Sequence, residues 1–266
     1  MRVIILLAFL ILFVYTSSFC QSNISDEVKE IFNIGKDIID RNVNKENIRE
    51  HISYEQSKIY AKKLSQAIVN DPLGFNIYLS QEYLKWKEET KKNNYKPVTV
   101  KPAYKLYMLE QVIENYFGET FSNVISTPYF LRVKVIALTT SIYTSKSAKI
   151  KTKQTDLLVE VEDILKGKKY INIGDSIRIS YLNWWINQCD IKFEKGKSYL
   201  LPIKLTECIE NEGCINYTLK VFDNECKAIK EIENELVKRP ESILGNMTAV
   251  KWQQFKSEFI KKYLNF

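Results

Sequence analysis

Four cysteines in the C-terminal half are the residues of this chain best suited to covalent chemistry. They are Cys189, Cys208, Cys214 and Cys226, and a fifth, Cys20, lies near the start of the chain. An even number of cysteines in an exported chain favours disulfide bonds, and four allow three pairings. We favour Cys208 with Cys214, which closes a short turn, and Cys189 with Cys226, which closes a longer loop.

The histidine content argues against a zinc site and against several kinds of catalysis. No Cys-x-x-Cys pair occurs, and His51, the only histidine, lies far from the cysteines in sequence. A Ser-His-Asp or Cys-His arrangement would need His51, which has no nucleophile motif beside it. No phosphate-binding glycine loop, dinucleotide fingerprint or HExxH motif occurs either. The sequence therefore predicts no catalytic residue, no metal and no other cofactor.

Aromatic and basic residues form the candidate ligand site. Tyr181, Trp184 and Trp185 gather at the end of an expected strand, and Lys149 and Lys151 lie in a lysine-rich connection. Aromatic rings beside a basic groove can bind an anionic chain by stacking and charge neutralisation. The alternatives are a half-buried tryptophan pair and a solvated lysine loop. We expect the partner to be an extracellular protein or an anionic polymer. We expect no nucleic acid, because the apolar N-terminus predicts export.

The N-terminus has the pattern of a secretory leader. Arg2 supplies a positive charge, residues 3–15 form an apolar run, and small residues near Cys20 fit a cleavage site. We expect residues 1–20 to be a signal peptide, which makes the mature chain secreted or extracytoplasmic. Lipid modification of Cys20 is the alternative. No later segment is long and apolar enough to be a predicted transmembrane helix.

The composition and the first half of the chain predict a folded, largely helical region. Of the 266 residues, 45% are hydrophobic and 27% are charged, and the net charge of +7 fits a soluble surface as well as an anionic partner. Ser53 with Gln56 is a candidate capping box, and Asp71-Pro72 is a typical helix start. We expect a small helical bundle over residues 21–126. The middle of the charged stretch 85–101 is expected to be a loop.

The hydrophobic period changes from helical to alternating after residue 127. Five runs alternate apolar and polar residues, namely 130–138, 157–165, 176–182, 198–205 and 215–222. Five strands with short turns and one long connection, 139–154, predict a small barrel over residues 127–226. In the last segment, 227–266, the spacing of Ile229, Ile232 and Leu236 is helical, and a final helix is expected from about Thr248. We expect these helices to pack on the barrel.

Five short motifs follow one another through the predicted strands. They are Leu-Val-Glu-Val (158–161), Ile-Leu-Lys-Gly (164–167), Gly-Asp (174–175), Cys189 and the Phe-to-Leu element 193–201. In their order and spacing they resemble the netrin-like module, the OB-type β-barrel also found in tissue inhibitors of metalloproteinases. The resemblance covers about residues 128–235 and implies a barrel with helices packed at its ends. Those inhibitors chelate zinc through a mature N-terminal cysteine, which this barrel lacks, so no active residue carries over.

The predicted fold class is α+β, with an N-terminal small helical bundle, a five-stranded OB-type barrel and C-terminal helices. The predicted function is that of a secreted, non-catalytic binding protein. One alternative is an extracellular enzyme with carboxylates at the domain junction, which a carboxyl of raised pKa in a cleft there would favour. The other is a structural protein anchored to an envelope through a lipid on Cys20.

Overall fold

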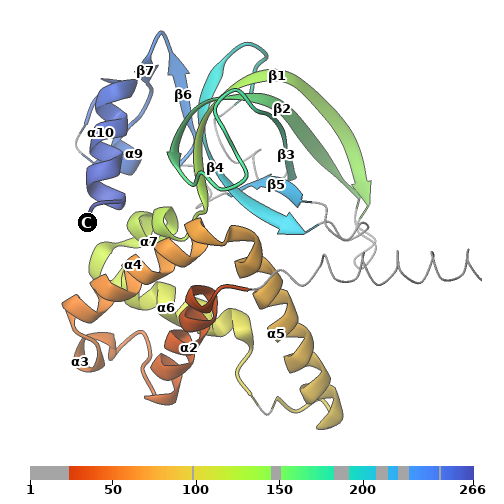
Figure 1. Ribbon diagram of the computed structural model, residues 1–266, viewed down its shortest axis with the longest axis vertical. Coiled ribbons are helices and arrows are strands. Elements are labelled where there is room, and N and C mark those ends of the chain that lie inside the picture. Colours follow the sequence, from red (N-terminus) through yellow and green to blue (C-terminus); the bar gives the residue numbers. More distant parts are fainter. Residues whose placement is uncertain are drawn as a thin grey trace, which may run out of the picture.

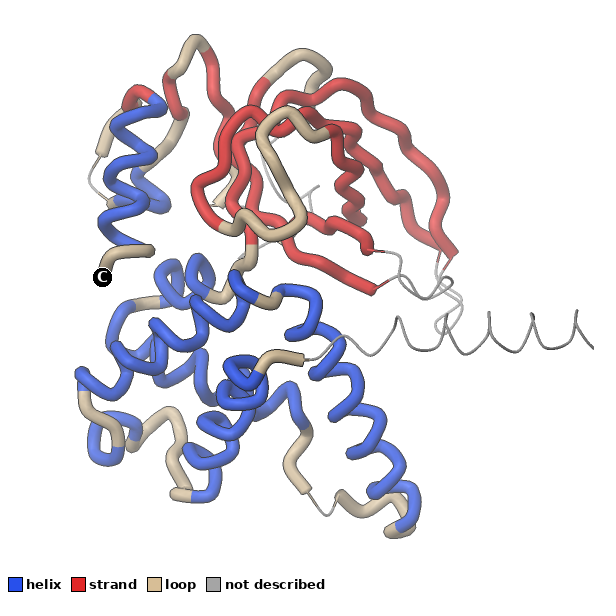
Figure 2. Tube along the Cα trace, in the orientation of Figure 1, coloured by secondary structure: helices blue, strands red, loops and turns tan. Residues whose placement is uncertain are grey.

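The described chain forms a helical half and a barrel half that lie against each other. The structure is a computed structural model that describes residues 24–97, 99–144, 151–182, 192–207, 215–220, 228–245 and 247–266. Figure 1 places the N-terminal helices below and the barrel above, with the C-terminal helices at one side, and Figure 2 shows the same separation of helix and strand. The predicted α+β class, with N-terminal helices and a closed five-stranded barrel, is confirmed.

The helical half starts where local capping signals occur. Its described helices are α2 (Asp26–Asp40), α3 (Ile48–His51), α4 (Tyr54–Asn70), α5 (Pro72–Lys92), α6 (Pro102–Phe117) and α7 (Glu119–Ile125). The capping box is present, because the Gln56 amide donates to Ser53 Oγ at 3.2 Å and the Ser53 amide to Gln56 Oε1 at 2.9 Å. Asp71 caps α5 by accepting a hydrogen bond from the Gly74 amide at 3.0 Å.

The helix α5 ends within the stretch 85–101, whose middle was expected to be a loop. The helix continues to Lys92, and the chain turns at Asn93, in the middle of that stretch. Lysine, glutamate and tryptophan dominate residues 85–92 and are compatible with helix, and the first proline after Pro72 is Pro97. The loop begins only where two asparagines, Asn93 and Asn94, interrupt these residues.

Five strands close the barrel. They are β1 (Tyr129–Thr144), β2 (Lys151–Lys166), β3 (Ser176–Leu182), β4 (Ser198–Glu207) and β5 (Ile215–Leu219). The strand β1 pairs antiparallel with both β2 and β4, and β3 pairs parallel with β5. The strands therefore close in the order β1-β2-β3-β5-β4-β1, which is consistent with an OB-type barrel.

The β1–β2 hairpin reaches further than the predicted strands. The connection 139–154 was expected to be an exposed loop, yet pairing continues from Thr139 with Asp156 to Thr144 with Lys151. Threonines on both strands favour extended backbone, and the hydroxyls of Thr140 and Thr155 lie 3.2 Å apart across the ladder. The strand β3 accompanies β2 as far as Gln154, and beyond this point the hairpin is a two-stranded ribbon.

The segment after the barrel is mixed rather than helical. It contains β6 (Lys230–Glu233), β7 (Leu236–Val237), α9 (Glu241–Leu244), β8 (Val250–Lys251) and α10 (Trp252–Tyr263). The expected helix through Ile229, Ile232 and Leu236 was wrong. Asn234 and Glu235 have φ of 49° and 64° and form a two-residue hairpin turn, and Ile232 pairs with Ser198 of β4. The expected final helix is present as α10.

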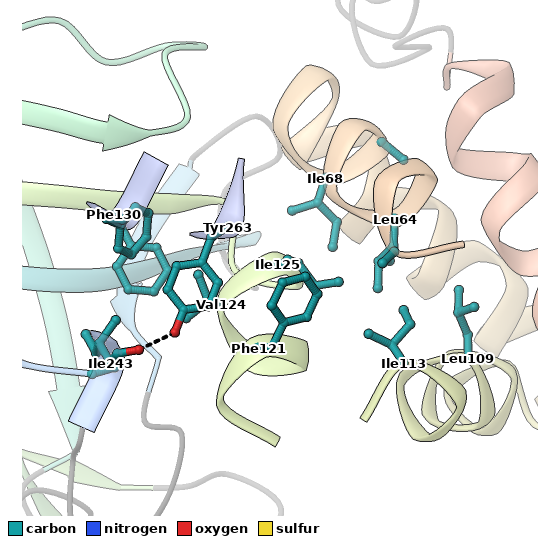
Figure 3. Close-up of a cluster of buried hydrophobic side chains, with 14 of the residues drawn as sticks. Leu64, Ile68, Leu109, Ile113, Phe121, Val124, Ile125, Phe130, Ile243 and Tyr263 are labelled. Atoms are coloured by element: carbon teal, nitrogen blue, oxygen red, sulfur yellow. Dashed lines mark hydrogen bonds between the residues drawn. The ribbon is translucent and has the colours of Figure 1, made fainter. Parts of the chain in front are cut away.

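One hydrophobic core continues from the helical half into the C-terminal helix. Phe121, Val124 and Ile125 of α7 lie between Tyr263 of α10 and the side chains of α4 and α6 (Figure 3). Phe130 projects from β1 into the same core and lies 5.1 Å from Phe259 between ring centroids. A separate core fills the barrel. Burial of each large apolar side chain contributes about 1.5–3 kcal/mol, so α7 and α10 hold the two halves together.

None of the helices within the described ranges is both long and apolar enough to cross a lipid bilayer.

Candidate binding groove

An open groove of about 410 Å³ lies where the barrel meets the start of α10. Strands β1 and β2, the turn before β3 and the first turn of α10 provide its walls. We call it the barrel groove, and it is lined by Arg132, Glu160, Val161, Glu162, Asp163, Ile173, Gly174, Trp252 and Gln253. These residues are far apart in sequence, so the groove exists only because of the sheet pairing and the docking of α10.

Arg132 organises one side of the barrel groove. Its Nε donates to Glu162 at 2.9 Å, and its Nη1 donates to Glu235 at 2.8 Å. The guanidinium also lies 5.3 Å from the ring of Trp252, within cation–π distance. Hydrogen bonding to Glu235 raises the pKa of Arg132 despite its burial and lowers the pKa of Glu235. Both groups therefore stay charged, and the left-handed turn at Glu235 is held against β1.

Asp163 organises the other side and fixes α10. It accepts hydrogen bonds from Trp252 Nε1 at 2.8 Å and from Lys256 Nζ at 2.7 Å, and the Ile164 amide also donates to it at 2.8 Å. Burial alone would raise the pKa of Asp163, but these bonds, first that of Lys256, hold it below its usual value. A carboxylate with this many donors remains ionised at neutral pH, and its geometry is rigid.

Two of the remaining lining residues, Glu160 and Ile173, face solvent. Glu160 lies opposite Lys134 in the β1–β2 ladder, yet its carboxylate makes no ion pair or hydrogen bond with any residue that the structure describes. Ile173, in the turn before β3, is 64% exposed. Three carboxylates and one guanidinium line the groove, so its net charge is −2 on a chain whose net charge is +7. The barrel groove is therefore acidic and has an apolar rim.

Two of the five residues proposed from sequence as a ligand site, Tyr181 and Lys151, are described, and they lie towards the other end of the barrel. Tyr181, at the end of β3, is half-buried, and its ring centroid lies 5.5 Å from that of Phe193. Burial raises the pKa of Tyr181. Lys151 begins β2, whose early residues pair with the end of β3, so both positions lie towards one end. Outside the described residues lie Trp184, Trp185, Lys149, the leader 1–20 and all four cysteines, Cys189, Cys208, Cys214 and Cys226.

A cluster of amines and a carboxyl lies at the junction of the two halves. Lys166 of β2 is buried, and its Nζ donates to the carbonyls of Val124 at 2.9 Å and Ile125 at 2.6 Å. Lys220 donates to Ser126 Oγ at 2.9 Å. Both lysines thus cap the C-terminus of α7, where carbonyls lack helical partners and attract positive charge.

Burial shifts the pKa of each ionisable group in this junction cluster. It holds the pKa of Lys166 well below its ordinary value and lowers that of Lys220 to about 8. Burial also raises the pKa of Glu110, which nearby Lys220 partly offsets. Glu110 lines neither the barrel groove nor the second groove, which runs along α5 in the helical half. The arrangement therefore has an immediate structural explanation as a cap on α7.

The alternation of apolar and polar residues in 157–165 predicts that Glu160 and Glu162 lie on a solvated strand face, but no sequence pattern predicted a site at Arg132, Asp163 and Trp252. The only local signal was the apolar stripe of α10 that begins at Trp252, whose indole N–H needs an acceptor when buried. Within the described ranges, no three His, Cys, Asp or Glu side chains come together as a metal site. No protein-family model matches the chain, and comparison with curated proteins finds no match.

Proposed function

We propose that this chain is an exported, non-catalytic binding protein whose barrel groove receives part of a protein partner. The observation that carries the proposal is that some side chains of the groove are held by bonds within the chain while others are free to contact a partner. Arg132, Glu162 and Asp163 are fixed by bonds within the chain, whereas Glu160 and Ile173 face solvent. A rigid frame around a few available side chains is the arrangement that recognition requires.

The protonation states in the groove favour binding over acid–base catalysis. A general acid at neutral pH needs a carboxyl of raised pKa. The pKa of Asp163 is lowered by its hydrogen-bond donors despite its burial, and the pKa of Glu235 is lowered by Arg132. Neither carboxyl carries a proton to donate, so these residues act as structural anions.

The charge and shape of the groove select the partner. A net charge of −2 with an exposed isoleucine on one wall favours a protein segment that carries lysine or arginine. Such a side chain can lay its aliphatic stem on Ile173 and bring its charge to Glu160. An anionic polymer would instead be repelled here. It remains the second partner class, for the end of the barrel where Tyr181 and Lys151 lie.

The proposal also includes a secreted or extracytoplasmic location for the mature chain. The leader pattern in residues 1–20 and the even set of cysteines in the C-terminal half support a secreted or extracytoplasmic protein with disulfide bonds. A netrin-like, OB-type module is the scaffold that we propose for it. The closed five-stranded barrel is consistent with that scaffold.

A capture experiment with groove variants tests the proposed function. The immobilised chain is compared with Ile173→Asp and Glu160→Lys, and with Ile59→Asp as the matched control, since Ile59 is 50% exposed on α4 in the helical half. We expect a protein from the extracellular fraction to bind the wild type and the control, and to be lost from both groove variants. Retention of that protein by both groove variants would refute the barrel groove as the binding site.

The enzyme alternative has one observation in its favour, at the junction of the two halves. Glu110 has a raised pKa, and Lys220 has a pKa of about 8, as an acid–base pair would require. Replacement Glu110→Gln tests this role. If the chain has a hydrolytic activity that disappears in a folded Glu110→Gln variant, the junction is catalytic and the binding proposal is incomplete.

A further inference from the structure

The end of α5 carries a concentration of positive charge. Between Lys85 and Lys101 there are six lysines and two glutamates, so this short stretch has a net charge of +4. Figure 1 shows that the C-terminal end of α5 projects away from the rest of the helical half. A lysine-rich stretch at the tip of a projecting helix is accessible to a large partner.

The lysines at this tip divide into paired and unpaired ones. Lys85 forms an ion pair with Glu82 at 2.9 Å, and Lys101 lies 5.4 Å from the ring of Tyr83. Four others make no ion pair with any residue in the described parts of the chain, namely Lys87, Lys91, Lys92 and Lys96. Their charges are therefore directed to solvent.

The segment that follows α5 covers one of its faces and leaves the opposite face open. Trp86 Nε1 donates to the Thr99 carbonyl at 3.0 Å, and the Thr99 hydroxyl donates to Glu89 at 3.2 Å. The uncovered face presents Leu84, which is 58% exposed, with Lys87 and Lys91 one turn and two turns further on. An apolar side chain therefore lies among unpaired lysines.

Tyr95, in the turn that follows α5, is exposed and has a strained backbone. It is 76% exposed, and both Asn94 and Tyr95 adopt left-handed backbone, with φ of 53° and 62°. The turn is held by the Tyr95 amide, which donates to the Thr90 carbonyl at 2.8 Å. Left-handed backbone suits glycine or asparagine better than a bulky residue. The turn itself therefore does not require a tyrosine at this position.

We propose that the end of α5, with Leu84, Tyr95 and the four unpaired lysines, docks on an anionic lipid surface. Lysines near such a surface attract phosphate-bearing headgroups, and each strengthens the association about fivefold. A tyrosine ring with its polar hydroxyl is suited to the interface between headgroups and acyl chains. A dissolved polyanion would use the lysines alone, whereas a lipid interface also takes up Leu84 and Tyr95. This surface is separate from the barrel groove and goes beyond the proposed function.

Vesicle sedimentation of the mature chain, which begins after the expected leader 1–20, tests the proposal. The vesicles are phosphatidylcholine alone and phosphatidylcholine with about one third phosphatidylglycerol, at low ionic strength. We expect binding to the anionic vesicles only. The triple variant Lys87→Gln, Lys91→Gln, Lys92→Gln should weaken that binding about a hundredfold, from about fivefold for each lysine.

Two further variants separate specific docking from net charge and from misfolding. A control triple variant removes the same charge from exposed lysines elsewhere, as Lys168→Gln, Lys195→Gln and Lys261→Gln, and should bind almost as the wild type does. Tyr95→Asn should fold normally, because asparagine tolerates left-handed backbone, and should bind several-fold more weakly.

Equal losses in the two triple variants would overturn the proposal, since net charge would then account for binding. Unchanged binding of Tyr95→Asn would also overturn it. Retention on a heparin resin without vesicle binding would replace the lipid by an anionic polymer.

Discussion

A rise in pH from about 8 to about 10 is expected to increase the free energy of unfolding. Burial against the end of α7 lowers the pKa of Lys220 from 10.5 to about 8 and holds that of Lys166 well below 10.5. Between the folded and unfolded values, the unfolded chain keeps a proton that the folded chain has released. Stability therefore rises with pH across this window, because the unfolded state binds more protons.

The magnitude follows from the size of the shift. A single group changes stability by about 1.4 kcal/mol for each pH unit between its two pKa values. Lys220 therefore contributes at most about 3 kcal/mol, and Lys166 adds to it in the same direction. Burial raises the pKa of Tyr129 and Tyr263, which oppose the trend only above their ordinary pKa of 10.0, where the unfolded tyrosines lose protons first.

Urea unfolding at pH 8, 9 and 10, followed by tryptophan fluorescence, measures this dependence. Lys220→Met removes one titrating amine while keeping an apolar chain of similar length, so its stability should rise less steeply than that of the wild type. Lys168→Met, at an exposed position, is the control and should keep the wild-type slope. The same slope in Lys220→Met as in the wild type would refute the account of the junction cluster.

Three substitutions test the packing that positions the grooves. Gly35→Ala should destabilise the chain by about 2 kcal/mol despite alanine's better helix propensity, because its Cβ would lie 2.3 Å from the Lys105 carbonyl oxygen. A thermal unfolding midpoint at or above that of the wild type would contradict this close approach. Ser53→Ala should cost about 1 kcal/mol by removing the cap of α4, and an unchanged urea midpoint would show that the cap is dispensable. Arg132→Met should lower the free energy of unfolding by about 2–3 kcal/mol, because it removes ion pairs with two carboxylates. Quenching of Trp252 fluorescence should reveal loosening of α10. Wild-type stability would mean that these ion pairs do not hold α10.

Local signals in the sequence predicted elements whose causes are local. The box formed by Ser53 and Gln56 and the cap at Asp71 depend on residues three positions apart, and both are present. Alternation likewise predicted the barrel strands, because each strand has one face in the core. The spacing of Ile229, Ile232 and Leu236 fits a helix as well as a hairpin, and pairing with β4 decided for the hairpin.

The barrel groove could not be predicted in this way. Arg132, Asp163 and Trp252 come together only through strand register and the packing of α10, which depend on contacts between distant parts of the chain. Alternation identified Glu160 as solvated but gave no information about what lies across from it. The junction lysines were missed for the same reason, since Lys166 was read only as part of a turn motif.

Hydrogen–deuterium exchange of the chain with its captured protein partner shows whether the partner occupies the barrel groove. We expect slower amide exchange at 160–163, 172–175 and 251–254, the segments that build the barrel groove, when the partner is bound. Protection should disappear when Ile173→Asp replaces the wild type. Protection confined to other segments, with these three unchanged, would contradict the assignment of the barrel groove as the binding site.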